Sequence, residues 1–146
     1  RSIPFPWIAR LDPLDPSVGE AAGRIELEVP ADFAVLAEGR RVRAESADGT
    51  RIRAGGRPNE PAGDAAFWSE ALAFHLGDFY RSTDPVDAGA YRGVVFESRD
   101  REPYAYLVAI TPRGDELLVV EAFFPTLAAR DEHLEPITGM LEGGRP

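Results

Sequence analysis

The chain has 146 residues and a formal net charge of −9, and its length suits a single domain. The negative charge disfavours nucleic acids and anionic membrane surfaces as partners, because both attract clustered positive charge. All 16 basic residues are arginines and cysteine is absent, which excludes lysine Schiff bases, thiol nucleophiles, disulfides and thiolate metal sites.

Residues 1–23 are predicted to form a proline-rich N-terminal arm or linker. Its prolines disfavour helix and favour extended backbone. They are Pro4, Pro6, Pro13 and Pro16. Large apolar side chains lie between the prolines, and we expect part of the arm to pack against the domain; the alternative is a tether to an upstream segment. These apolar residues are Phe5, Trp7, Ile8, Leu11 and Leu14.

Residues 24–142 are predicted to form one α+β domain, and residues 143–146 a short C-terminal tail. Apolar and acidic residues alternate over Arg24–Val29, which predicts a half-buried strand that ends at Pro30. Phe33–Leu36 is typical of a short second strand.

A hairpin is predicted around Asp48-Gly49, a dipeptide that favours tight turns. A three-residue loop over 47–49 gathers the apolar residues of both strands on one face, whereas a one-residue slip mixes the two faces. Gly49 would then adopt the left-handed conformation of a bulge. The pairs in this register are Val42 with Ala54 and Ala44 with Ile52.

The first helix is predicted over Ala65–Leu76, after a loop that covers Gly55–Asp64. Asp64 is expected to cap the helix, and Gly77 to end it. At about 100° per residue, one broad arc of the helix is apolar. The residues in this arc are Phe67, Trp68, Ala71, Leu72, Phe74, Leu76 and Phe79.

Three further strands are predicted at Ala90–Ser98, Tyr104–Ile110 and Leu117–Phe124. Short turns join them, so they should form an antiparallel meander. The last helix is predicted to begin at Pro125, with a kink or a break at Pro136. Its apolar face consists of Leu127, Leu134, Ile137 and Leu141.

This order of elements resembles the Mog1/PsbP-like fold. Members open with a strand that ends in a proline and a nearby aromatic residue, and Val29-Pro30-Ala31-Asp32-Phe33 stands at that place here. The run Ala90–Phe96, followed by Tyr104–Ile110 and by Leu117–Pro125, is similar to the second half of such domains. The resemblance implies an α/β/α sandwich around an antiparallel sheet. It also implies a non-enzymatic helper rather than an enzyme, since relatives include envelope lipoproteins, photosystem extrinsic subunits and GTPase-binding accessory proteins.

The two histidines are weak candidates for chemistry. His75 falls in the apolar arc of the first helix, where Asp78 shares its side, and a core position is expected rather than a proton shuttle. His133 lies near Asp131, Glu132 and Glu135, and we expect a side chain at the surface edge of the second helix. A metal would need further ligands from elsewhere, and no HExxH spacing is present, so no metal site is predicted.

The polar face of the hairpin is the best candidate for binding. Four arginines on one strand pair could bind a phosphate, a carboxylate or an acidic partner. The alternative is that these charges only protect a sheet edge from aggregation. The four residues are Arg41, Arg43, Arg51 and Arg53.

We therefore expect a non-enzymatic accessory or binding domain of the bacterial cell envelope, which acts through a protein partner or a small ligand. No catalytic residue and no cofactor are predicted. No transmembrane segment is predicted either, since the apolar runs fall short of the roughly 18 residues that span a bilayer. A lipid anchor upstream of Arg1 would place the chain in the periplasm or on the outer face of the envelope. The alternatives are a small acidic cytoplasmic partner-binding protein, such as a secretion chaperone, and an enzyme that uses His75.

Overall fold

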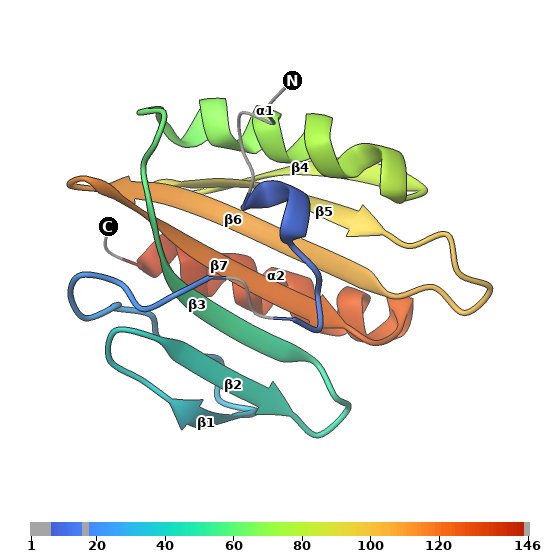
Figure 1. Cartoon of the computed structure of the whole chain (residues 1–146). Helices are drawn as coiled ribbons and strands as arrows, with labels where there is room; N and C mark the ends of the chain where they lie inside the picture. The colour runs from blue at the N-terminus through green and yellow to red at the C-terminus, as the bar shows by residue number, and fades with distance from the viewer. Residues whose placement is uncertain (1–6, 16–17, 145–146) are drawn as a thin grey trace.

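The protein is described by a computed structural model, which covers residues 7–15 and 18–144. An antiparallel sheet lies between two helices, so the chain forms an α/β/α sandwich (Figure 1). This confirms the predicted α+β class. The strands are β1 (Phe33–Ala37), β2 (Val42–Ser46), β3 (Arg51–Pro58), β4 (Ser82–Ala88), β5 (Tyr91–Glu97), β6 (Ala105–Arg113) and β7 (Glu116–Phe124). The helices are α1 (Ala65–Leu76) and α2 (Leu127–Gly143), with short 3₁₀ turns η1 (Ile8–Arg10) and η2 (Gly77–Phe79).

The seven-stranded sheet has the order β1-β2-β3-β7-β6-β5-β4. It consists of two meanders, β1 to β3 and β4 to β7, that meet where β3 pairs antiparallel with β7. The predicted meander of three strands is confirmed, and β4 extends it as a strand that we did not predict. Pro85 lies in β4 and has no N–H for a ladder hydrogen bond, which is tolerated because β4 is an edge strand.

The hairpin between β2 and β3 has the predicted register. Val42 pairs with Ala54 and Ala44 with Ile52, and Gly49 has a φ of 90° in the loop. The predicted loop over Gly55–Asp64 was wrong in its first part, because β3 continues to Pro58. The glycines there let the arm approach closely, since a Cβ atom on Gly55 would collide with the carbonyl oxygen of Gly19.

The predicted strand over Arg24–Val29 was wrong, although its alternation was correct. Ile25 is buried, and Leu27 and Val29 pack against the same core. However, the segment covers one face of the sheet instead of joining its ladder, and the Ile25 N–H bonds to the carbonyl of Gly39 between β1 and β2. An alternating pattern therefore identified a buried side but not a paired backbone.

Helix α1 has the predicted bounds, and the Asp64 carboxylate accepts a hydrogen bond from the Phe67 N–H at 2.8 Å. Its buried face is narrower than the predicted arc. Phe74 and Phe79 have 78% and 68% of their surface exposed, and Phe67 is also exposed. The residues that face the sheet are Trp68, Ala71, Leu72 and Leu76.

Helix α2 begins after Pro125 rather than at it, because the Thr126 hydroxyl caps the helix by accepting from the Ala129 N–H at 3.0 Å. The helix continues through Pro136, so a break there was wrong. Ile137 and Leu141 are buried as predicted, and Leu127 and Leu134 pack partly against the same core.

Two apolar cores lie on opposite faces of the sheet. One is formed with α2, and the other with α1 and the arm, to which Trp7, Ile8 and Leu11 contribute. The described part of the arm thus packs against the sheet through these three side chains. Some residues of the predicted arm and tail lie outside the described residues. These are Pro4, Phe5, Pro6 and Pro16 of the arm and the last two residues of the tail.

Candidate functional site

The four arginines predicted as a binding face line one hollow, which we call the arginine pocket. Its volume is about 250 Å³. Strands β2 and β3 form its floor, Leu36 of β1 and Leu14 and Val18 of the arm border it, and Glu121 of β7 closes one side. The arginines that line it are Arg41, Arg43, Arg51 and Arg53.

The pocket exists because this part of the sheet has no helix above it. Helix α1 packs on β5 and β6, and Figure 1 shows β1 to β3 at the far end of the sheet. The arm crosses between these two regions, and Leu14 and Leu36 remain exposed at the rim. Charged side chains of β2 and β3 are thereby left facing solvent on the same side as the arm.

Arg53 and Glu121 form a buried ion pair at the side of the pocket. Only 2% of the surface of Glu121 is exposed, and its Oε2 lies 3.1 Å from Arg53 Nη2. The Tyr106 hydroxyl donates a hydrogen bond to the same oxygen. Burial raises the pKa of Glu121, and Arg53 and Tyr106 only partly offset this effect. Sequence analysis missed Glu121; the signal was a lone acid within the apolar run of β7, at a position that pairs with Arg53.

The other three arginines are less strongly held. Arg51 lies 3.6 Å from Glu45, and Arg41 donates to the Val18 carbonyl at 3.4 Å. Arg43 has no hydrogen bond or ion pair to any residue that the structure describes. Four arginines and two glutamates are thus among the described residues that line the pocket, so its formal charge is positive although the chain is acidic.

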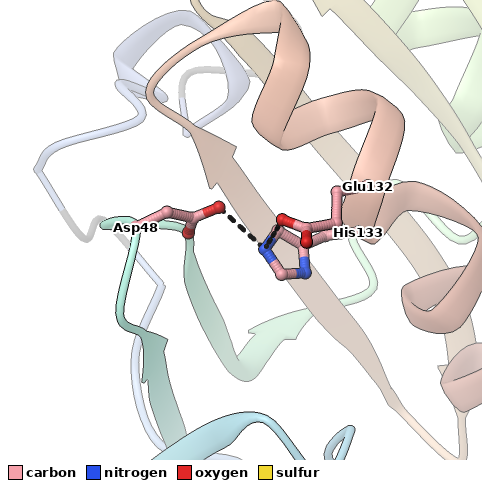
Figure 2. A group of neighbouring side chains, drawn as sticks. All are labelled: Asp48, Glu132 and His133. Carbon is pink, nitrogen blue, oxygen red and sulfur yellow. Dashed lines mark hydrogen bonds and ion pairs between the residues drawn. The ribbon is translucent and has the colours of Figure 1, made fainter.

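A second group of functional side chains surrounds His133 (Figure 2). Only 3% of the surface of His133 is exposed, so the predicted surface-edge position was wrong. The Phe33 ring packs edge-on against the imidazole at 5.1 Å. His133 Nε2 lies 2.9 Å from Asp48 Oδ2 and 3.3 Å from Glu132 Oε2. On the other side of the ring, Nδ1 lies 3.6 Å from Asp32 Oδ2.

The hairpin loop holds Asp48 in place. Its Oδ1 accepts from the Ser46 hydroxyl and, at 3.1 Å, from the Thr50 N–H. Burial by itself would raise the pKa of Asp48, but the hydrogen bonds from Ser46, Thr50 and His133 outweigh it and hold that pKa well below its usual range. Asp48 is 85 residues from His133 in the chain, so no local motif could reveal this contact.

His75 and Asp78 lie outside both sites. His75 is partly buried near the end of α1, with its ring edge-on to Phe74 at 5.2 Å, and Asp78 is exposed in η2. Of the acids near His133 in sequence, Glu132 contacts it, whereas Asp131 pairs with Arg130 at 3.0 Å.

No family model matches the chain, and no curated protein matches its sequence. Two solved structures are similar in fold. LpqN of Mycobacterium tuberculosis, described as involved in cell envelope biogenesis, has a TM-score of 0.51 and 15% identity, over 91% of this chain and 87% of LpqN. A protein from Bacteroides thetaiotaomicron has a TM-score of 0.50 and 12% identity, over 83% of this chain and 44% of its own. This chain thus spans less than half of the Bacteroides protein, and both likenesses concern the fold.

Among the described residues, neither helix has the length and apolar character needed to cross a membrane.

Proposed function

We propose that this chain is a non-enzymatic binding domain of the bacterial cell envelope, of the Mog1/PsbP-like kind, and that it binds an anionic group in the arginine pocket. The observation that carries the proposal is that four arginines line one hollow of about 250 Å³. Among the described residues, two carboxylates line the same hollow: Glu121 pairs with Arg53, and Glu45 with Arg51.

The chemistry of the pocket favours a phosphate or carboxylate ligand. Guanidinium groups bind such anions through two parallel hydrogen bonds, and Arg43 has no competing partner in the described structure. The volume of about 250 Å³ falls just below the range of ligand pockets, roughly 300–1,000 Å³. A small anion, or an acidic side chain of a protein partner, therefore fits better than a large cofactor. Exposed leucines at the rim favour an apolar portion next to the anionic group.

Calorimetric titration tests the binding part of the proposal. Citrate, inorganic phosphate and an acidic peptide are titrated separately into the protein, so that small anions and peptide partners are distinguished. Arg43→Gln should weaken the binding of any anion that uses the pocket about tenfold or more, because a charged hydrogen bond is lost. Arg99→Gln is the matched control, since Arg99 is exposed and does not line the pocket. The proposal would be contradicted if none of the three ligands binds, or if Arg43→Gln and Arg99→Gln lose the same affinity.

The envelope location rests on the fold shared with LpqN, a protein described as involved in cell envelope biogenesis. Fractionation of the native organism tests it: we expect the full-length protein in the envelope or periplasmic fraction. Protease added to intact spheroplasts should degrade an outward-facing protein. Recovery in the cytoplasmic fraction alone, with protection from protease, would contradict this location.

One observation favours a second candidate, a small acidic partner-binding protein of the cytoplasm such as a secretion chaperone. Phe74 and Phe79 are largely exposed near the end of α1, which is typical of a surface that another protein covers. Such chaperones are usually dimers. Light scattering that shows a clean monomer would exclude this candidate, whereas binding of anions in the pocket would not depend on it.

A further inference from the structure

We propose that His133, Asp48 and Glu132 form a binding site for a divalent transition-metal ion such as Zn²⁺ (Figure 2). The ion would fasten the β2–β3 loop to α2, because Asp48 belongs to the loop and the other two ligands belong to the helix. The site is separate from the arginine pocket, whose lining includes none of these three residues. It is therefore independent of the proposed anion binding.

The ligand atoms have the spacing that a small cation needs. One nitrogen and two carboxylate oxygens all lie within 4.8 Å of one another, and Nε2 is 2.9 Å and 3.3 Å from the two oxygens. Ligand atoms at zinc–ligand distances of about 2.0–2.2 Å in a tetrahedron are roughly 3.3 Å apart. An ion can therefore enter the group once the Asp48 and Glu132 carboxylates adjust their positions around His133 Nε2.

The two ring nitrogens of His133 explain why a cation suits this group better than a neutral imidazole alone. Carboxylates approach both nitrogens, but a neutral imidazole has only one N–H to donate. With the proton on Nε2, which then donates to Asp48, the lone pair of Nδ1 faces Asp32; with the proton on Nδ1, the lone pair of Nε2 faces two carboxylates, so either tautomer leaves a repulsive contact. A metal ion on Nε2 removes this repulsion. The Nδ1–H then donates to Asp32, which is the usual arrangement around metal-bound histidines.

The site is held in shape on one side and open on the other. Hydrogen bonds from Ser46 and Thr50 occupy Oδ1 of Asp48 and leave Oδ2 directed at His133. The Phe33 ring holds the imidazole plane. Glu132 is exposed, so an ion can enter from solvent and keep water as a further ligand. One imidazole and two carboxylates suit Zn²⁺ better than Ca²⁺, which prefers six to eight oxygens.

Calorimetric titration of chelator-treated protein with ZnCl₂ and, separately, CaCl₂ tests the proposal. We expect one Zn²⁺ ion per chain, weaker binding of Ca²⁺, and a higher melting temperature with Zn²⁺. Glu132→Gln and Asp48→Asn should each reduce the Zn²⁺ affinity at least about tenfold. Asparagine keeps the loop hydrogen bonds of Asp48, so that variant should still fold. Glu135→Gln is the control, because it makes the same change at an exposed glutamate of α2 that is not a proposed ligand. This variant should bind Zn²⁺ as the unaltered chain does.

Nuclear magnetic resonance of the imidazole nitrogens supplies a second readout. Zn²⁺ should shift the Nε2 resonance of His133 and leave a protonated Nδ1. The proposal is overturned if Zn²⁺ does not bind, if Glu135→Gln weakens binding as much as Glu132→Gln, or if both His133 nitrogens stay protonated when Zn²⁺ is present. The last result would identify His133 as an imidazolium held by three carboxylates.

Discussion

Arg43 on β2 lies directly opposite Arg53 on β3 in the pairing of the two strands. Arg53 has a carboxylate partner in Glu121, whereas Arg43 has none among the described residues. Like charges at opposite positions of an antiparallel pair repel each other, so the chain keeps Arg43 at a cost in stability. Within the described part of the chain, the charge of Arg43 thus has no carboxylate partner, as the proposed anion binding requires.

Replacing Arg43 should therefore leave the fold intact or stabilise it slightly. We expect Arg43→Gln to change the free energy of unfolding by about 0 to +1 kcal/mol at low salt, because the repulsion with Arg53 is removed. Urea unfolding measures the change. Raising the salt concentration should reduce the difference from the unaltered chain. A loss of stability at low salt would show that Arg43 makes an intramolecular contact that matters for folding.

Replacing Arg53 should instead be strongly destabilising, in a way that depends on pH. Arg53→Met leaves the buried carboxylate of Glu121 with Tyr106 as its hydrogen-bond donor, and breaking such a pair costs about 3 kcal/mol. Burial raises the pKa of Glu121, so stability linked to this group is fully present below its ordinary pKa and is lost as pH rises through the raised pKa. Loss of Arg53 raises this pKa further.

The deficit of Arg53→Met should consequently be larger at about pH 8 than at about pH 5, because the lower pH favours the protonated form of Glu121, whose pKa is raised. Urea unfolding at both pH values measures it. The double variant Arg53→Met with Glu121→Gln should recover much of the stability at the higher pH, because no buried charge remains. An equal deficit at both pH values would contradict the assignment to Glu121.

A side chain at Gly55 should detach the arm from β3. In Gly55→Ala the new Cβ collides with the carbonyl of Gly19, which accepts the Gly56 N–H at 2.9 Å. We expect the free energy of unfolding to fall by about 1–3 kcal/mol. Tryptophan fluorescence should shift to the red, because Trp7 of the arm packs against Trp68 of α1. Gly23→Ala is the control, since its Cβ would make only ordinary contact. Unchanged fluorescence in Gly55→Ala would show that the arm does not depend on this approach.

Two glycine-to-alanine substitutions should change the free energy of unfolding in opposite directions. Gly49 has a φ of 90° in the β2–β3 loop, where an alanine is strained, so Gly49→Ala should lose about 1–2 kcal/mol. Gly139 lies within α2 with open space around its Cβ position, and Gly139→Ala should gain about 0.5–1 kcal/mol. Melting temperatures of the two variants measure both effects. A stabilising Gly49→Ala would contradict the left-handed loop.

Local sequence patterns correctly predicted those elements whose structure depends on residues close together in the chain. The β2–β3 register followed from gathering apolar residues on one face, and the start of α1 followed from the Asp64 cap. Strand β4 was missed because Pro85 and its acids obscure the strand pattern, and only its place at the sheet edge permits them. The segment 24–29 was assigned a strand because alternation reports which side chains are buried, not whether the backbone pairs.

The alternation over residues 41–45 and 51–54 determined by itself that four arginines share one side, because side chains on successive residues of a strand point to opposite faces. Only the tertiary structure decided that this side stays uncovered, that the arm and Glu121 complete a pocket there, and that Asp48 meets His133. These contacts join segments far apart in the chain. They depend on how the whole sheet is ordered and covered, which no short stretch of sequence specifies.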